Sequence, residues 1–327
     1  MSAQSPQRLI ARQPTDRKMT DRPNLCIQIG LHKTGTTTLN HEFYPKHPDI
    51  HHLGKPYDHD DPVRLLMEEI NLTPEAEFDL EDCKRRFAQA VLPHLKGNKL
   101  VTINESSLAG GVGVERSVVA RRLRAVCGSC KILVVLRRQD ELLRSYYFQA
   151  VGTQKSRLAF EDWLSEGWVF ARPAAFSLID YYHLVAPYAA AFGRERVGVF
   201  LFEDLVANPD SFARELSSFM GIDAGASARL MAAKPRNPRM SRLHVFVRKW
   251  PGLLRLAQWI REGGPRPAVA ALRWLAGRSG RAEAEMTPEL ARRLVDFIGR
   301  SNRRLAQEFG LPLDRHSYPL PAMGSEP

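Results

Sequence analysis

The residues with the clearest chemical potential lie between Asn24 and Phe43, in the segment NLCIQIGLHKTGTTTLNHEF. Its apolar run from Leu25 to Ile29 predicts a short buried strand. Gly30 to Gly35 predict a tight turn, and we expect a helix from Thr36 onward. A strand that enters a helix through such a turn directs backbone N–H groups and the positive helix end at one point. That geometry binds a phosphate or a similar anion.

This turn differs from the nucleotide-triphosphate loop GxxxxGK[ST] at its lysine. Gly30 and Gly35 occupy the glycine positions and Thr37 the hydroxyl position, but Thr36 stands where the lysine belongs. The nearby lysine is Lys33, three positions earlier. The segment therefore keeps the anion-binding backbone and alters the arrangement for a metal nucleotide. A glycine turn with an ordinary surface lysine is the alternative interpretation.

A second anion-binding pair follows the apolar run KILVVL, from Lys131 to Leu136, which predicts a central parallel strand. Arg137 follows this strand, and Ser145 comes eight residues later on the expected helix. An arginine binds phosphate with a planar fork, and a serine hydroxyl adds a neutral donor. Because a helix rises only about 1.5 Å per residue, the two side chains can reach one anion if the helix folds back beside the strand end.

The two motifs together resemble those of the bacterial sulfotransferase family that uses 3′-phosphoadenosine 5′-phosphosulfate (PAPS). KTGTT is similar to the family's 5′-phosphosulfate loop, and the arginine–serine pair, followed by Tyr146 and Tyr147, is similar to its 3′-phosphate motif. The sequence departs from the family at Gln139, where a proline is common. The resemblance implies an α/β three-layer sandwich with a central, mainly parallel sheet, similar to that of P-loop NTPases.

The resemblance also implies roles for these residues in binding PAPS and its product, adenosine 3′,5′-bisphosphate. Lys33 would hold the bridging oxygen, and Arg236 and Asn237 would belong to a loop that covers the nucleotide. This layout requires no metal, because one lysine and a helix end face a smaller charge than a triphosphate carries. The residues implied for nucleotide binding are Lys33, Thr34, Gly35, Thr36, Thr37, Arg137, Ser145, Arg236 and Asn237.

Transfer to a hydroxyl also requires a general base for the acceptor's proton. Glu105 follows a second apolar run, Leu100 to Ile103, and ligands of open parallel sheets bind at the carboxyl ends of strands. It resembles the glutamate of the EKTP-like segment in glycan-modifying sulfotransferases, although Ser106 and Ser107 follow it here. We predict Glu105 as the catalytic base, with His32 as the alternative. The alternative is that Glu105 has a purely structural role, in a salt bridge to an arginine of the cleft.

Three further polar features have weaker signals. Six of the ten histidines lie between positions 32 and 59, without the spacing of a known metal site, so we expect hydrogen-bonded or solvated rings. Lys55, in HHLGKP, resembles a residue in the family's connection near the acceptor cleft. Glu203 and Asp204 resemble the family's YEDL acidic pair, which implies a structural role in a strand-to-helix turn.

Length and composition favour one α/β domain. The chain has 327 residues, 44% of them hydrophobic, and no apolar run long enough to span a bilayer. We expect residues 1–22 to be a flexible polar lead without a signal core, 23–327 to form the sulfotransferase domain, and the protein to stay in the cytoplasm. Cys127 and Cys130 form a lone CxxC, for which we expect buried thiols over a zinc or redox site.

The positive charge is concentrated in one segment. The chain's formal net charge is +11, and residues 234–281 hold twelve basic residues and one acidic residue, so the rest is balanced. Trp250, Trp259 and Trp274 lie among these arginines. Basic amphipathic helices with tryptophan are candidates for lying on an anionic membrane surface, so peripheral contact of 246–278 with its inner face is one interpretation. A pair of helices packed on the domain, with their arginines in water, fits the pattern equally, and the segment could instead bind an acidic glycan.

The sequence thus predicts transfer of a sulfuryl group from PAPS to a hydroxyl or amine, with a carbohydrate or glycolipid as the favoured acceptor. A P-loop kinase or NTPase, and a non-catalytic anion- or membrane-binding module, are the competing hypotheses. No nucleic-acid partner is expected, because the basic segment contains no recognised nucleic-acid module. The leading hypothesis requires Lys33 and Arg137 to lie at the two charged ends of one nucleotide.

Overall fold

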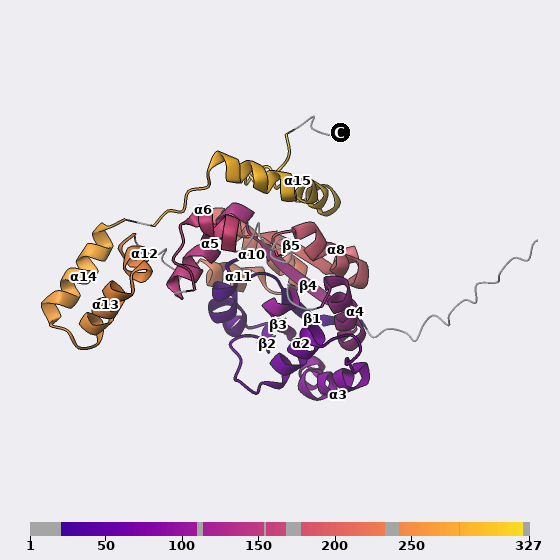
Figure 1. Ribbon diagram of the computed structural model, residues 1–327. Coiled ribbons are helices and arrows are strands. Elements are labelled where there is room, and N and C mark those ends of the chain that lie inside the picture. Colours follow the sequence, from indigo (N-terminus) through magenta and orange to yellow (C-terminus); the bar gives the residue numbers. More distant parts are fainter. Residues whose placement is uncertain are drawn as a thin grey trace, which may run out of the picture.

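A five-stranded, entirely parallel sheet lies at the centre of the molecule (Figure 1). The computed structural model describes residues 21–109, 114–153, 155–167, 178–232, 242–280 and 282–322. The strand order is β2-β3-β1-β4-β5. The strands are β1 (Asp21–Ile29), β2 (Ile50–His52), β3 (Leu100–Asn104), β4 (Ser129–Leu136) and β5 (Val197–Leu201). The predicted parallel sheet is confirmed.

The direction of the connections reverses at the middle of this sheet. From β1 the chain passes to β2 and β3 on one side, and from β4 it passes to β5 on the other. β1 and β4 are neighbours, with Ile27 beside Ile132 and Ile29 beside Val134. In open α/β sheets the crevice at such a switch point, outside the carboxyl ends of the strands, is where ligands bind. The segments after β1 and β4 therefore meet at this crevice.

Helices cover both faces of the sheet, because side chains of successive strand residues alternate between the faces. Ile27 and Ile29 belong to one apolar cluster, with α2–α5, α8 and α15, and Cys26 belongs to the other, with α10 and α11. The helices of these layers are α1 (Thr36–Thr38), α2 (Pro62–Leu72), α3 (Leu80–Ala90), α4 (Arg116–Cys127), α5 (Gln139–Gly152), α6 (Phe160–Asp162), α8 (Tyr181–Phe192), α9 (Phe202–Ala207), α10 (Pro209–Met220), α11 (Ala224–Met231) and α15 (Pro288–Phe309). The three-layer α/β sandwich is confirmed.

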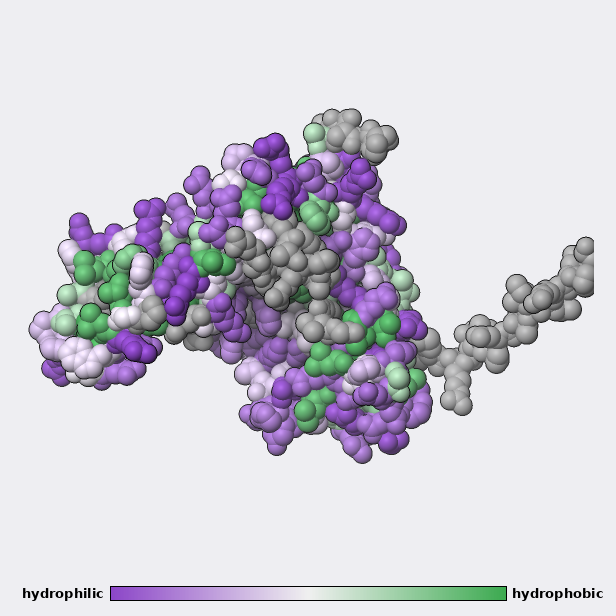
Figure 2. Space-filling model, viewed as in Figure 1, coloured by the Kyte–Doolittle hydropathy of each residue, from purple (hydrophilic) through white to green (hydrophobic). Residues whose placement is uncertain are grey.

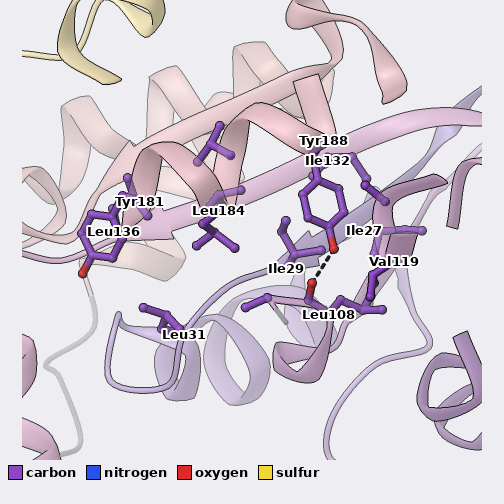
Figure 3. Close-up of a cluster of buried hydrophobic side chains, with 14 of the residues drawn as sticks. Ile27, Ile29, Leu31, Leu108, Val119, Ile132, Leu136, Tyr181, Leu184 and Tyr188 are labelled. Atoms are coloured by element: carbon purple, nitrogen blue, oxygen red, sulfur yellow. Dashed lines mark hydrogen bonds between the residues drawn. The ribbon is translucent and has the colours of Figure 1, made fainter. Parts of the chain in front are cut away.

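The larger cluster is closed by aromatic side chains from α8. Tyr188 lies fully buried among aliphatic side chains of the sheet, and its hydroxyl donates to the carbonyl of Leu108 (Figure 3). A buried hydroxyl without a partner would be destabilising, so this bond fixes where α8 sits against the segment after β3. Tyr181 lies at the other end of the same helix, near Leu136 at the end of β4.

Two helical segments of the first half of the chain are interrupted. The helix predicted from Thr36 continues from α1 into a π-helical turn at Leu39–Phe43 and then a short 3-10 turn with Pro45 at its start. The segment from Pro62 to Ala90 divides into α2 and α3, with an intervening stretch that contains Pro74. A proline lies at each break, and because proline has no backbone N–H it cannot donate the hydrogen bond that a continuing helix needs.

Three helices form an arm that extends from the layered domain at one end of the molecule (Figure 1). They are α12 (Arg242–Lys249), α13 (Pro251–Gly263) and α14 (Arg266–Arg278). After the arm the chain returns to the domain as α15, whose start is capped by the hydroxyl of Thr287. Among the described helices, none is both long and apolar enough to cross a membrane.

Candidate nucleotide-binding and transfer site

The loop after β1 has a backbone that few residue types adopt. Gly30, Lys33 and Gly35 all have positive φ values, of 140°, 70° and 84°. Gly35 also lies against α9, because a Cβ at this position would be 3.1 Å from the ring of Phe202 and 3.2 Å from Leu205. Glycine at position 35 is therefore required by conformation and by space together. Lys33 adopts the left-handed region although it carries a side chain.

The threonines of the loop take different positions. Thr34 is buried, and its hydroxyl donates to the carbonyl of Leu31 over 2.8 Å, so this side chain shapes the turn. Thr36 is half-buried and Thr37 exposed at the start of the helix. The first N–H groups of a helix have no acceptor within it, so the amides at this point can bind an acceptor from outside the helix, such as an anion.

Arg137 reaches the loop from the end of β4. Its guanidinium Nη1 donates to the carbonyl oxygen of Lys33 over 3.1 Å, and its Cζ lies 5.0 Å from the ring centroid of Phe202. The Arg137 carbonyl in turn accepts the hydroxyl of Tyr181 at 2.5 Å. Lys33 and Arg137 are thus neighbours at the switch point.

Glu141 is a partner of Arg137 that the sequence analysis did not identify. Its Oε2 lies 3.2 Å from Nη2 of Arg137, and its Oε1 lies 2.6 Å from Nη1 of Arg144. A phosphate bound by Arg137 would therefore share the guanidinium with this carboxylate. Ser145 is half-buried on the same helix, and no hydrogen bond found among the described residues uses its hydroxyl.

Glu105 lies at the end of β3 with only 4% of its surface exposed. Its Oε1 accepts hydrogen bonds from Nζ of Lys55 at 3.0 Å and from the amide of Ser107 at 2.9 Å. The same ammonium donates to Oγ of Ser106 at 2.9 Å. Glu105 therefore does form an ion pair, as the purely structural alternative predicted, but its partner is Lys55 and not an arginine. This places Lys55 directly beside the predicted base.

His32 completes this group from the loop side. Its Nε2 lies 3.2 Å from Oγ of Ser106, and the ring is exposed. Partial desolvation and the charges of Lys55 and Lys33 lower the pKa of His32, and Glu105 opposes part of this shift. The imidazole is therefore neutral at pH 7, the form that can accept a proton. The two candidate bases, Glu105 and His32, are linked through Ser106 and Lys55.

A buried polar network supports the loop from below. Oε1 of Gln28, on β1, accepts hydrogen bonds from the hydroxyl of Tyr44 at 2.5 Å and from Nδ2 of Asn104 at 2.9 Å. Nδ2 of Asn104 also donates to Oδ1 of Asn40 at 2.5 Å. All four side chains are less than a tenth exposed, and burial raises the pKa of Tyr44 well above its usual value. The only sign of this network in the sequence is that Gln28 interrupts the apolar run from Leu25 to Ile29. Such networks fix one arrangement of the elements they join.

The acidic pair after β5 has the structural role that was predicted. Glu203 accepts the backbone N–H of Arg138 at 2.9 Å and the hydroxyl of Tyr318 at 2.8 Å. Asp204 lies 2.7 Å from Nε2 of His316. The pair therefore joins the end of β4 to the C-terminal segment. Gln139, the first residue of α5, stands where a proline is common in sulfotransferases. Its side chain is fully buried, and its Nε2 donates a hydrogen bond to Oδ1 of Asn302 over 2.7 Å.

Other candidates lie outside the crevice or outside the described residues. Cys127 and Cys130 are both fully buried, as predicted, and burial raises the pKa of Cys127 to about 12. Over the described ranges, no group of three histidine, cysteine or acidic side chains is placed to hold a metal ion. Arg236 and Asn237, predicted as nucleotide contacts, lie in a segment that the structure does not describe.

Comparison with known proteins gives distant structural likenesses. No model of a protein family matches the chain, and no curated protein does. A sulfotransferase from Alicyclobacillus acidocaldarius aligns with 79% of this chain and 97% of its own, at 24% identity and a TM-score of 0.45. The sulfotransferase domain of the Synechococcus PCC 7002 olefin synthase covers 92% of this chain and 100% of its own (13% identity, TM-score 0.41), and mouse sulfotransferase SULT7A1 complexed with PAP covers 88% and 90% (14%, 0.39). All three TM-scores are below 0.5, so these are distant likenesses.

Proposed function

We propose that this protein transfers a sulfuryl group from PAPS to a hydroxyl or amine of an acceptor. The observation that carries the proposal is the contact between Arg137 and the loop carbonyl of Lys33 over 3.1 Å. It brings a second cation to the anion-binding turn, at the edge where the strand order favours a ligand. The guanidinium would bind the 3′-phosphate, and the loop would bind the 5′-phosphosulfate.

Lys33 has the role of stabilising charge during transfer. Sulfuryl transfer, like phosphoryl transfer, places negative charge on the leaving oxygen and spreads charge over the moving group. None of the described acidic side chains forms an ion pair with the ammonium of Lys33, so it is available for that charge. The loop amides at Gly35, Thr36 and Thr37 would bind the 5′-phosphate, and Ser145 would add a donor at the 3′-phosphate.

Glu105 is the proposed general base, with His32 as the alternative. Both hydrogen bonds to the Glu105 carboxylate go to Oε1, so Oε2 is the atom proposed to take the acceptor's proton. Lys55 would hold the carboxylate in place through its hydrogen bond to Oε1. His32 is neutral at pH 7 and lies on the exposed side of the same cluster, which supports its role if the acceptor enters over the loop.

The nucleotide assignment is tested by ligand discrimination. Intact protein is expected to bind adenosine 3′,5′-bisphosphate more tightly than adenosine 5′-monophosphate in the presence of a chelator, because only the former can bond Arg137. Arg137→Ala should reduce this discrimination by about one to two orders of magnitude, the value of charged hydrogen bonds. Arg144→Ala is the matched control, because it removes an equal charge from α5 that pairs with Glu141.

Calorimetry gives these affinities, and two outcomes of the measurement would overturn the assignment. One is equal affinity of the intact protein for the two nucleotides. The other is an unchanged ratio in Arg137→Ala. A P-loop kinase or NTPase would instead bind ATP with magnesium more tightly than either nucleotide, although Thr36 occupies the lysine position of that loop.

The proposed acceptor is a carbohydrate or glycolipid, and the proposed location is the cytoplasm, at the inner face of a membrane. The support for the acceptor is the position of Glu105 beside Lys55, Ser106 and His32, a polar group that suits hydroxyl-rich substrates. Incubation with labelled PAPS and cell-envelope fractions tests it: label should enter glycan or glycolipid material in a reaction that requires Lys33. Transfer only to small alcohols or amines would contradict it.

A further inference from the structure

The arm formed by residues 242–280 exposes apolar side chains to an unusual degree. Of the twelve large apolar side chains exposed in the described part of the chain, seven belong to this arm. Trp259 and Trp274 are each 60% exposed and Trp250 is 58% exposed. The full set on the arm is Phe246, Trp250, Leu253, Leu256, Trp259, Trp274 and Leu275. Figure 2 shows hydrophobic and hydrophilic surface side by side on this part of the molecule.

These side chains are not scattered around the helices. On α13, Leu253, Leu256 and Trp259 follow at steps of three residues, so they lie along one side of the helix. Leu254, Ala257 and Ile260, which are less exposed, lie on the adjoining side that packs within the arm. The helix therefore has more apolar surface than the arm itself covers.

The exposed surface on α14 has the same character. Trp274 and Leu275 are adjacent, and the exposed Ala271 lies one turn before them. The guanidinium of Arg278 lies 4.9 Å from the ring centroid of Trp274, which places a cation beside the exposed indole. An indole with a neighbouring arginine is a combination suited to the boundary between headgroups and acyl chains.

Basic side chains flank this apolar surface. Residues 242–280 contain eight lysine and arginine residues and one acidic residue, Glu262. Two of the eight attach the arm to the domain: Arg248 donates to the carbonyl of Gly152, and Lys249 to that of Leu158 at 3.0 Å. The remaining cations, including the exposed Arg255 and Arg266, lie on α12–α14 with the tryptophans.

We propose that α12–α14 dock on an anionic lipid bilayer, with the exposed tryptophans and leucines at the acyl boundary and the arginines among anionic headgroups. Each lysine or arginine near such a surface adds to the attraction for anionic headgroups, and aromatic side chains anchor the interface. An apolar partner protein would not require the excess of positive charge. An acidic soluble partner would not require exposed tryptophans. The anionic bilayer accounts for both.

Vesicle sedimentation tests the proposal independently of the sulfuryl-transfer reaction. The intact chain is expected to bind vesicles of phosphatidylcholine with roughly 30 mol % phosphatidylglycerol, and to bind phosphatidylcholine alone much more weakly. The double variant Trp259→Ser and Trp274→Ser should lose about tenfold or more of this affinity. Phe297→Ser is the control, because Phe297 is 56% exposed on α15, outside the arm.

Tryptophan fluorescence identifies the inserted side chains. Lipids brominated in their acyl chains should quench the intact protein, and the double variant should lose the part of this quenching that comes from Trp259 and Trp274, while Trp250 remains on the arm and Trp163 is 6% exposed inside the domain. Failure of the intact chain to bind anionic vesicles would overturn the proposal. So would binding that is unchanged in the double variant, or a dimer in analytical ultracentrifugation that the same two substitutions dissociate.

Discussion

Replacing Lys33 by glycine should separate the two tasks of this residue. Its backbone adopts φ 70°, in a region where a side chain is strained and glycine is not. Its ammonium is the proposed stabiliser of the leaving oxygen. Glycine relieves the backbone and removes the charge, whereas alanine removes the charge and keeps a Cβ. The pair of variants therefore distinguishes strain from chemistry at one position.

The expected stability difference follows from the backbone. The left-handed conformation costs about 1–2 kcal/mol for a residue with a Cβ. Glycine also makes the unfolded chain more flexible, which lowers the free energy of unfolding by about 0.5–1 kcal/mol. The free energy of unfolding of Lys33→Gly should therefore exceed that of Lys33→Ala by about 0–1.5 kcal/mol. Turnover with PAPS should fall by about 100- to 1,000-fold in both variants, since each lacks the charge.

Urea denaturation followed by circular dichroism gives the free energies, and transfer of labelled sulfate to the acceptor gives the turnover. The reasoning fails if Lys33→Gly unfolds more easily than Lys33→Ala, because the loop would then not be strained at this residue. It also fails if either variant retains turnover within a few-fold of the intact protein, because the ammonium would then not act on the transferred group.

Three further outcomes are expected. Glu105→Gln should keep affinity for adenosine 3′,5′-bisphosphate and lower turnover by about a hundredfold or more; if His32→Gln has that effect and Glu105→Gln does not, the base is His32. Burial lowers the pKa of both His32 and His52, so their neutral forms are favoured in the folded state. The unfolded chain then takes up protons first as pH falls below about 6.5, and the free energy of unfolding should decrease there, which urea titrations at several pH values would show and a flat profile would contradict. Gly35→Ala should reduce the free energy of unfolding by about 1–3 kcal/mol, because its Cβ would be strained and would lie 3.1 Å from a ring, and an unchanged urea midpoint would contradict this.

The sequence alone located the elements that depend on neighbouring residues. Apolar runs gave the strands at Leu25–Ile29 and Lys131–Leu136 because a parallel strand buried on both faces needs apolar residues throughout. The glycines around Lys33 predicted the loop, since positive φ values favour glycine. The strand ends then placed Arg137 and Glu105 at one edge of the sheet. Each of these inferences uses residues within about one element of each other.

The partners of the site residues could not be predicted in this way. Lys55 reaches Glu105 across fifty residues of sequence, and Gln28 meets Asn104 across seventy-six. Glu141 lies close to Arg137 in sequence, but whether it pairs with the guanidinium depends on how α5 folds back from β4. Such contacts depend on the packing of whole elements, because local periodicity specifies which face of an element is buried and not which side chain it will meet.

The basic segment shows the same division. Its composition determined that charge and tryptophan would gather between residues 234 and 281, because both are read directly from the sequence. Whether Trp259 and Trp274 would face a core or the solvent was open, since an amphipathic helix buries its apolar side against any surface that is available. Only the tertiary structure decided that these two indoles stay exposed, because the described contacts of the arm with the domain run from α12 to Gly152 and Leu158, and α13 and α14 extend beyond them (Figure 1).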